Sequence, residues 1–496
     1  MTTLRRWFDF DSIAWSAPLI IAAFLSASMA WVSAFNVHPD EKDHARAADY
    51  YRTHWLPPTF DDPDAAPSYS RYGYSYLNER DIVYLIAGKW SVIVEPLVGD
   101  INLSYRLFNL TLFLAIVFVF VRKVEARHLL IPLSLSAQIW YIFSYFNADA
   151  FALAAALFAA YQIAARGSVF NAALDSNTRL RWFGGVLLLG IGFGLLLLAK
   201  RNYYIFLAFL AAYVALREIG PRAALGLTLG MLVSLGWYFR VPFGVAWWLY
   251  GAEGLIAVAL IIVDVRRHIS ETAFRRRIGT FIAAGTIGLA LFLPRVAFDK
   301  LVVENPANSI STVQAAAEVY AADGFKPSQV ANAVAESALR AQSAIHLRER
   351  GMSYLAMLSG DERWLGRSYI SMVGVYGYFA ISSSKQFYAA VAFAYLMFVV
   401  SLGYGAWRSR DAYARQSLAI AAAFGAMVIL MSSLHSWTSD FQPQGRYLFP
   451  AFVMLGVAMK DNRARMPTAV MVAAALAFVL AVYSFCGTGL ELIEKR

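Results

Sequence analysis

Charged residues are scarce in this sequence. Only 15% of its 496 residues are Asp, Glu, Lys or Arg, whereas a soluble domain usually carries about a quarter. Hydrophobic residues make up 59% of the chain, and the mean hydropathy is +0.51. These values exclude an ordinary soluble domain and predict an integral membrane protein.

Cysteine and nucleotide-binding patterns are also lacking. Cys486 is the single cysteine, so an internal disulfide is impossible and cysteine usage does not report the compartment. No βαβ pattern and no glycine-rich phosphate loop is present, which excludes Rossmann-type nucleotide binding. The formal net charge of +10 does not indicate nucleic acid, because the basic residues cluster in short segments between apolar runs.

Long apolar runs are the main feature that the sequence does have. A membrane-spanning helix needs about 20 apolar residues, and the runs predict about thirteen spans in an all-α polytopic membrane protein. The first run is too long for the core of a signal peptide, so we expect a retained span with the N-terminus inside. The predicted spans are residues 13–35, 103–121, 129–146, 149–165, 183–199, 202–216, 223–239, 244–263, 279–294, 386–404, 416–434, 446–459 and 467–485.

The short loops predict the orientation. Alternating the spans from an inside N-terminus places every basic loop inside and the C-terminus outside, as the positive-inside rule requires. These loops are 122–128, 217–222, 266–277, 407–415 and 460–465.

Two long segments, 36–102 and 295–385, then lie outside. Amphipathic helices are predicted in the second one, over 311–324 and over 328–351. The chain divides accordingly into an N-terminal membrane module (1–294, which includes loop 36–102), a helical outer loop (295–385) and C-terminal membrane helices (386–496).

Acidic residues follow the first span directly. Asp40 and Glu41 lie where the chain leaves the membrane, and the low-dielectric surroundings there can tune a carboxylate as a general base. His38 and His44 flank them. The alternative interpretation is a solvated loop, because Pro39–Asp40–Glu41 also resembles a helix start with capping acids.

Polar residues also occupy the next two outer turns. Asp149 lies between the third and fourth spans, where it could instead cap the fourth helix together with Asn147. Lys200, Arg201 and Asn202 form the turn between the fifth and sixth spans. Two cations on the outer side run against the positive-inside trend, and they suit either general lipid headgroups or one particular phosphate.

The last outer segment that carries chemistry is "HSWTSDFQPQGRYLFP", residues 435–450. Arg446 is expected at the outer surface near Gln444 and Tyr447, where its planar fork of donors suits a phosphate or an interfacial anchor role. Gly445 would allow a close backbone approach to a ligand. The aromatic stretch 361–379 fits a membrane interface better than a sugar platform.

Four motifs together resemble the GT-C superfamily of multi-span glycosyltransferases. They are "HPDE" (38–41), "FNADAFAL" (146–153), "LLAKRNYY" (197–204) and "QGRYLFP" (444–450). The order of these motifs covers the whole chain and is most similar to a poorly characterised bacterial branch. Protein O-mannosyltransferases and the lipid A aminoarabinose transferase are its better-known relatives.

The resemblance implies roles for particular residues. Asp40 or Glu41 would be the catalytic base. Asp149 would help to hold a metal or the donor. The cations that bind the donor phosphate would be Lys200, Arg201 and Arg446. Further contacts to donor, acceptor or metal would come from His38, His44, Asn202, Gln444 and Tyr447. The second acidic motif is a lone aspartate and not a DxD, which leaves a divalent cation (Mg or Mn) open.

The resemblance therefore predicts an inverting glycosyltransferase in the bacterial inner (cytoplasmic) membrane. It would move a sugar from a polyprenyl-phosphate donor to a hydroxyl of a glycan, lipid or protein at the periplasmic face. Two alternatives stay open. One is a flippase for a lipid-linked glycan, favoured by Glu253 within a span and by the glycine-rich stretch 236–248. The other is a noncatalytic subunit that binds a glycolipid.

Overall fold

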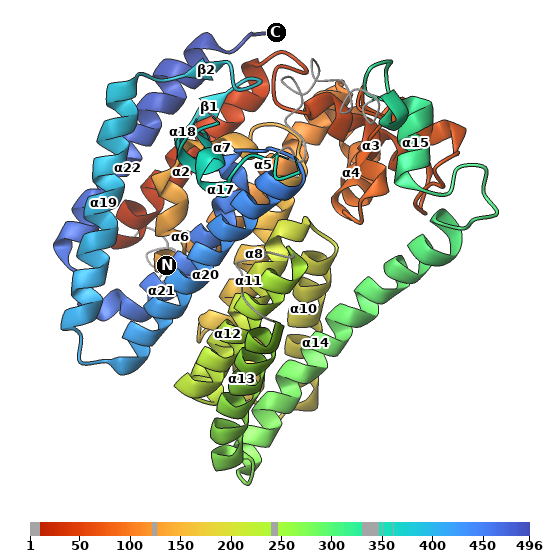
Figure 1. Cartoon of the computed structure of the whole chain (residues 1–496). Coiled ribbons are helices and arrows are strands. Elements are labelled where there is room, and N and C mark those ends of the chain that lie inside the picture. The colour runs from red at the N-terminus through yellow and green to blue at the C-terminus, as the bar shows by residue number, and fades with distance from the viewer. Residues whose placement is uncertain (1–9, 122–125, 240–246, 330–346, 350, 361) are drawn as a thin grey trace.

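The computed structural model describes residues 10–121, 126–239, 247–329, 347–349, 351–360 and 362–496. The described chain is mostly helical, and its single sheet is a pair of two-residue strands, β1 (Val375–Tyr376) and β2 (Ile381–Ser382). The strands are antiparallel, with Val375 opposite Ser382. This confirms the expected all-α class (Figure 1).

The longer helices follow the apolar runs. They are α2 (Phe10–Val32), α5 (Ile101–Val121), α8 (Ala148–Ala164), α10 (Arg179–Leu197), α11 (Tyr204–Glu218), α12 (Pro221–Tyr238), α13 (Trp247–His268), α14 (Thr272–Phe298), α19 (Lys385–Arg408), α20 (Ala412–Thr438), α21 (Phe449–Asn462) and α22 (Thr468–Ser484). Within the described residues, seven helices are long and apolar enough to cross a membrane. The chain is therefore a polytopic membrane protein.

Shorter helices connect these elements. The α-helices among them are α3 (Glu41–Thr53), α4 (Val83–Val98), α6 (Arg127–Leu130), α7 (Ala137–Ile142), α9 (Val169–Leu174), α15 (Val313–Tyr320), α17 (Tyr354–Ser359) and α18 (Trp364–Val373). The short 3-10 and π segments are η1 (Pro63–Ser68), η2 (Tyr76–Asn78), η4 (Ile131–Leu135), η5 (Arg201–Tyr203), η6 (Asp299–Val303), η7 (Gly445–Leu448), η8 (Arg463–Arg465) and η9 (Phe485–Leu490).

Two stretches differ from the sequence-based expectation. Residues 129–146 do not form one continuous helix but run through α6, η4 and α7, with Pro132 at the start of η4 and Ser136 capping α7. The segment is buried throughout, so its apolar character reflects the protein interior. Conversely, α4 was not expected, because its 16 residues include Lys89, Glu95 and Pro96.

The helix predicted over 311–324 is confirmed as α15, which is shorter than expected. Most of the second predicted helix, 328–351, lies outside the described residues.

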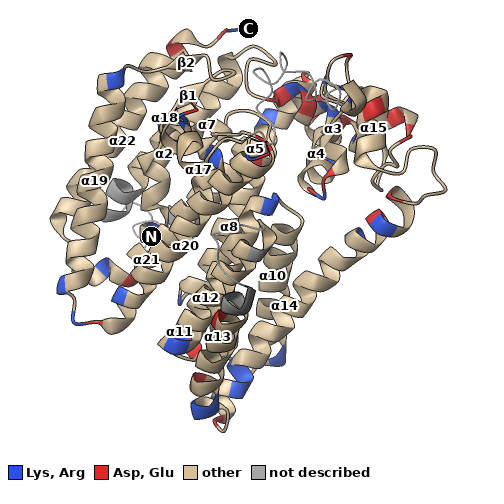
Figure 2. Ribbon diagram, viewed as in Figure 1, with Lys and Arg blue, Asp and Glu red and all other residues tan. Residues whose placement is uncertain are grey.

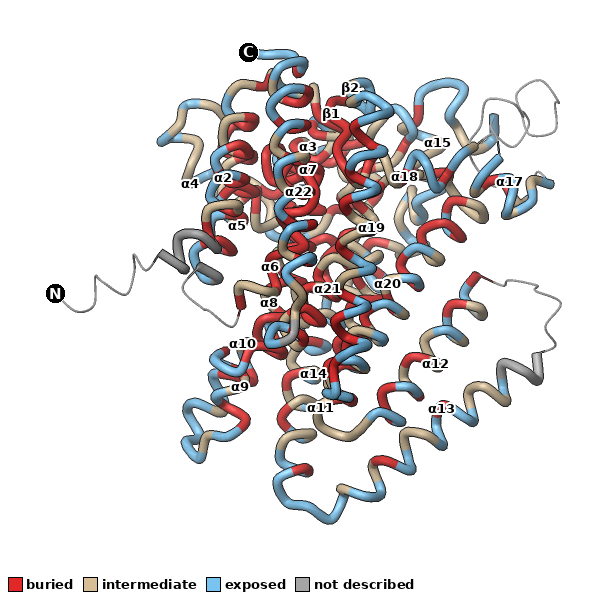
Figure 3. The backbone as a smooth tube through the Cα atoms, turned by 90° about the vertical axis from the view of Figure 1, so that its left-hand side faces the viewer, coloured by how far each residue is buried: buried red, intermediate tan, exposed pale blue. Residues whose placement is uncertain are grey.

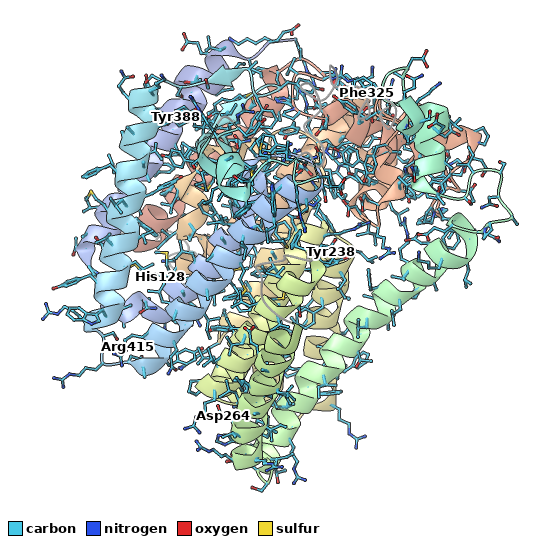
Figure 4. The ribbon with its side chains drawn as sticks, viewed as in Figure 1. His128, Tyr238, Asp264, Phe325, Tyr388 and Arg415 are labelled. Atoms are coloured by element: carbon cyan, nitrogen blue, oxygen red, sulfur yellow. The ribbon has the colours of Figure 1, made fainter. Side chains whose placement is uncertain are left out.

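The basic loops gather at one end of the molecule, which we call the basic end. Arg217 contacts the backbone of Ile163, and Lys460 contacts that of Ala164, while Asp264 accepts hydrogen bonds from the amides of Arg222 and Ala223. Figure 2 shows Lys and Arg clustered there, and Figure 4 shows Asp264 and Arg415 at this lower end. The loops 217–222, 266–277, 407–415 and 460–465, which were predicted to share one side of the membrane, thus lie at one end of the protein. Part of the remaining loop, 122–128, lies outside the described residues.

The other end, which we call the site end, collects α3, α15, α18 and the small sheet (Figure 1). The C-terminus also lies here, since Arg496 pairs with Asp100 at 2.9 Å at the start of α5. Burial is uneven along the bundle, as Figure 3 shows. The apolar window of α8 is 89% buried, whereas that of α14 is 11% buried and presents its apolar side chains outward. Helices such as α14 have the surface expected of a helix in contact with lipid.

Candidate functional site

Arg446 is the centre of a cluster of charged side chains at the site end. Its residue is only 6% exposed, and its guanidinium contacts two carboxylates. Nη2 lies 3.3 Å from Asp40 Oδ2, and Nε lies 3.5 Å from Asp149 Oδ2. Arg446 comes from the predicted C-terminal membrane helices and both acids come from the N-terminal module. The cluster therefore exists only when the two parts of the chain pack together.

The turn that carries Arg446 is held by its neighbouring glycine. The Gly445 amide donates to Ser371 Oγ at 2.7 Å, and a Cβ on Gly445 would lie 2.1 Å from the backbone nitrogen of Met372. Glycine thus allows η7 to pack directly on α18. The sequence suggested that this glycine admits a ligand, whereas the structure places another part of the protein backbone against it.

Asp40 has the geometry of an exposed, loosely held carboxylate. It precedes α3 in a left-handed conformation (φ 59°), which aspartate tolerates better than most residues. Its side chain makes no capping hydrogen bond, so the predicted position at a helix start is correct but the capping role is absent. The side chain is 38% exposed, which leaves the carboxylate accessible beside Arg446.

Glu41, the adjacent acid, has a different environment. Its two oxygens accept from Arg106 Nε at 2.6 Å and from Nη2 at 2.9 Å, and both side chains are almost completely buried. The Asn36 amide donates to the same carboxylate at 2.9 Å. Arg106 also donates to oxygens at and just beyond the end of α2, including the backbone oxygen of Ser33 at 2.7 Å and its Oγ at 3.0 Å. Glu41 therefore ties α3 and α5 to α2.

Asp149 lies in the first turn of α8. Asn147 is the residue that caps this helix, since its Oδ1 accepts from the Ala150 amide at 3.1 Å. Asp149 is then free to pair with Lys200, whose Nζ lies 2.9 Å from Oδ2. The helix N-terminus also favours a negative charge at this position. Two cations thus meet on one buried carboxylate oxygen.

The two histidines occupy different environments. His38 Nε2 is 2.8 Å from Ser33 Oγ and Nδ1 is 2.7 Å from the Tyr141 hydroxyl, so both ring nitrogens have protein partners. His44 Nδ1 is 2.8 Å from the Tyr84 hydroxyl, but its buried Nε2 has no partner among the described residues. Burial lowers the pKa of both histidines, reinforced by Arg106 for His38 and by Lys200 and Arg446 for His44. Both are therefore neutral near pH 7, and only His44 has a nitrogen left for a ligand.

The remaining predicted residues lie around this centre. The Arg201 side chain is 65% exposed and pairs with Glu79 at 2.8 Å, so it lies at the rim and not on Asp149. The Tyr447 ring lies 5.8 Å from Lys200 Nζ, and its hydroxyl donates to Gln442. Asn202 and Gln444 each keep a buried polar atom without a partner among the described residues.

Sequence reasoning missed Asp81. This aspartate is 7% exposed and precedes α4, with Glu79, Lys200 and Asp149 as electrostatic neighbours. Burial, reinforced by Glu79, raises its pKa to about 7. The one signal in the sequence is its position directly before the apolar stretch 82–87.

Tyr76 was also missed. Its ring stacks on the His44 ring, with 4.0 Å between the ring centroids. Nothing in the local sequence distinguishes it from the other tyrosines of loop 36–102.

Buried polar atoms that make no hydrogen bond within the described residues concentrate in this part of the structure, and one of them, Arg446 Nε, has only the 3.5 Å ion-pair contact to Asp149. They are His44 Nε2, Asp149 Oδ1, Asn202 Nδ2, the Tyr203 hydroxyl, Gln444 Oε1 and Arg446 Nε. Folded proteins leave few such atoms, because an unpaired buried polar group costs about 1–3 kcal/mol. Several of them around one ion-pair cluster indicate a site that a polar ligand or ordered water completes.

The same cluster is poorly suited to a divalent cation. Asp149 is flanked by Lys200 and Arg446, and their positive charges oppose a metal ion on this carboxylate. Within the described ranges, no three His, Cys, Asp or Glu side chains are grouped as metal ligands. The donor set therefore does not fit the metal that the family resemblance left open.

Two cavities lie elsewhere. One, of about 320 Å³, lies between α3 and η1 and is lined by residues such as Arg46, Tyr50 and His54. The other, of about 370 Å³, lies at the basic end between the start of α10 and α14. Neither includes Asp40, Asp149 or Arg446. We locate the candidate site by its charge cluster and by its polar atoms that make no hydrogen bond.

Comparison with known proteins adds little to this description. No protein-family model and no curated protein matches the chain. Among solved structures, the chain is similar to the crystal structure of ArnT from Cupriavidus metallidurans bound to undecaprenyl phosphate. The two share 14% sequence identity over 91% of this chain and 78% of that chain, with a TM-score of 0.26. A TM-score of this size does not establish a common fold, so the functional interpretation rests on the residues of this chain.

Proposed function

We propose that this chain is a membrane glycosyltransferase that uses a sugar carried on a polyprenyl phosphate, with its site at the periplasmic face. One observation carries the proposal: Arg446, a buried cation, lies within 3.5 Å of both Asp40 and Asp149. An accessible carboxylate and cationic side chains that can bind phosphate therefore lie together at one end of a membrane protein. These are the groups that the transfer of a sugar away from a lipid phosphate requires.

Each group has a defined role in the proposed reaction. Asp40 takes the proton of the acceptor hydroxyl, and the acceptor oxygen forms a bond to the anomeric carbon. The bond between that carbon and the phosphate oxygen breaks, and the electron pair leaves with the lipid phosphate. Attack opposite the leaving group inverts the anomeric centre. Arg446 and Lys200 stabilise the charge that develops on the phosphate.

The contacts between these groups fit this sequence of events. Arg446 pairs with Asp40 at 3.3 Å, a distance at the long end for a charged hydrogen bond. A donor phosphate would offer the guanidinium better acceptors, and the exchange would release the Asp40 carboxylate to act as a base. Asp149 keeps Lys200 and Arg446 oriented throughout. His44 Nε2 and Gln444 Oε1 are free to bind sugar hydroxyls.

Glu41 and His38 have no part in the chemistry under this proposal. Their polar atoms are already bound to Arg106, Ser33 and Tyr141. Of the two acids that the sequence offered as base, the geometry favours Asp40. The acceptor class is left open as a hydroxyl of a glycan, lipid or protein.

The test is transfer of radiolabelled sugar from synthetic polyprenyl-phosphate donors to an envelope acceptor pool. We expect transfer by the wild type and a loss of at least about 10²-fold in the Asp40→Asn and Arg446→Gln variants, since a base contributes about 10²–10⁴ and a charge stabiliser about 10²–10³. Asp323→Asn and Arg71→Gln are the matched controls, because both residues are exposed on outer loops. They should transfer like the wild type.

Three results would contradict the proposal. Full activity in both Asp40→Asn and Arg446→Gln would remove their catalytic roles. Absence of transfer with every donor, in folded protein that moves a lipid-linked glycan between leaflets, would favour the flippase. Binding of glycolipid without transfer or movement, unaffected by Asp40→Asn, would favour a noncatalytic binding subunit.

A further inference from the structure

The cavity at the basic end has no role in the proposed transfer reaction. It measures about 370 Å³ and is formed by the loop before α10, the first turn of α10 and the first turns of α14. Arginines line it from both helices: Arg179 from α10, and Arg275 and Arg276 from α14. The Trp182 indole donates to Thr280 Oγ1 at 3.0 Å and joins the two helices at the cavity.

These three arginines have no acidic partner. Within the described residues, no carboxylate lies within ion-pair distance of Arg179, Arg275 or Arg276. Arg276 binds only the side-chain oxygen of Asn177 and the backbone oxygen of Ser176. The nearby acids Asp175 and Glu218 pair with Arg277, at 2.7 and 3.3 Å. The cavity therefore has a net positive charge that the protein does not neutralise.

The start of α10 adds to this charge. Its N-cap residue, Thr178, lines the cavity and makes no side-chain hydrogen bond to the first turn. The amides of that turn and the helix dipole thus add a partial positive charge beside the arginines. Unpaired guanidinium groups together with helix amides favour a phosphate group.

An apolar surface continues from the cavity along both helices. On α10, Phe183 is one turn beyond Arg179 and 54% exposed. On α14, Ile282 is two turns beyond Arg275 and 63% exposed, and Leu289 follows at the same spacing. Residues at these spacings share a helix face. A phosphate in the cavity can therefore carry apolar chains that lie along these helices.

We propose that this cavity binds the phosphate of an anionic membrane lipid in the leaflet at the basic end. Free inorganic phosphate would satisfy the arginines equally well, but it would not use the exposed apolar face that begins one turn away. Basic pockets between membrane helices bind anionic headgroups by the same physical means. The inference does not depend on the transferase activity, because it concerns the opposite end of the molecule.

The test measures binding of fluorescent phosphatidylglycerol to the purified full-length protein in neutral detergent. The variant is Arg179→Gln/Arg275→Gln/Arg276→Gln. The matched control is Arg408→Gln/Arg410→Gln/Arg415→Gln, which removes three exposed arginines from another loop at the same end. Figure 4 shows Arg415 pointing away from the protein. We expect binding at least about tenfold weaker in the cavity variant and unchanged in the control.

Competitors distinguish the sources of phosphate. Unlabelled phosphatidylglycerol should displace the probe, whereas phosphatidylcholine and millimolar inorganic phosphate should not. Displacement by inorganic phosphate as effective as that by phosphatidylglycerol would overturn the lipid assignment. An equal loss of lipid binding in both triple variants, or a loss in neither, would contradict the assignment of the lipid site to this cavity. If the cavity variant fails to fold, Arg275→Gln alone must still weaken binding by about threefold or more.

Discussion

At the scale of single residues, two adjacent acids have different environments. Glu41 is bound on both oxygens by a buried arginine, whereas Asp40 is half-exposed and touches Arg446 through one long contact. The two carboxylates differ by one position in the chain, but the helix start turns them in different directions. Asp40 therefore keeps an accessible carboxylate, while Glu41 is part of the framework that holds α3 against α2 and α5.

This difference in environment predicts different losses of stability for two isosteric substitutions. Glu41→Gln leaves the buried Arg106 without its counter-charge and should cost about 3–5 kcal/mol of stability. Asp40→Asn loses a partly exposed ion pair and should cost about 1 kcal/mol or less, while transfer is lost. Thermal unfolding of both variants in detergent checks the prediction. A comparable loss of stability in the two variants would contradict it.

Asp81 predicts a dependence of stability on pH. Its carboxyl has a pKa of about 7 in the folded protein against 3.8 when unfolded, so between these values the folded state keeps a proton that the unfolded state releases. Stability therefore falls as the pH rises from about 4 to about 7. The amide introduced by Asp81→Asn does not titrate, so this variant should gain about 3 kcal/mol relative to wild type between pH 5 and pH 8.

The measurement for Asp81 is the unfolding midpoint of both proteins at pH 5, 6, 7 and 8. The Asp323→Asn variant is the control, because its side chain is 87% exposed. Parallel pH profiles for Asp81→Asn and wild type would show that Asp81 does not titrate as expected.

At the scale of elements, the position of Arg446 depends on how η7 packs on α18. Gly445→Ala would place a Cβ 2.1 Å from the Met372 nitrogen, so η7 must shift. A displacement of about 1 Å at a reacting group can cost about 10²-fold in rate. We expect a loss of that order in transfer by the folded variant.

The control for this substitution is Gly403→Ala in α19, where an added Cβ meets nothing within 4 Å. It should transfer at the wild-type rate. Wild-type transfer by Gly445→Ala would mean that η7 adjusts without moving the guanidinium.

At the scale of the whole molecule, the charged loops predict the orientation in the membrane. The basic end should face the cytoplasm and the site end the periplasm. In a Cys486→Ser background, which has no cysteine, Asp323→Cys should react with a membrane-impermeant maleimide in intact spheroplasts. Arg410→Cys should react only after the membrane is opened. The reverse pattern would invert the topology.

Local sequence was sufficient for most of the helices. Hydrophobicity and charge are properties of each segment, so the apolar runs and the basic loops could be identified without knowledge of packing. The exceptions have physical causes. Residues 129–146 are apolar because they are buried inside the protein, and Pro132 lies where the helix is interrupted. The shorter α4 carries Lys89 and Glu95, which interrupt its apolar run, so the sequence did not predict this helix.

The sequence by itself determined the class of protein, the nature of its charged groups and the end of the molecule where they gather. Only the tertiary structure decided which of those groups lie in contact. Arg106 lies 65 positions from Glu41 in the chain and binds the Glu41 carboxylate away from Arg446. Arg446 lies 406 positions from Asp40 and contacts the Asp40 carboxylate. Ion pairs act over a few ångströms, so their partners are chosen by the packing of distant helices and not by neighbours in the chain.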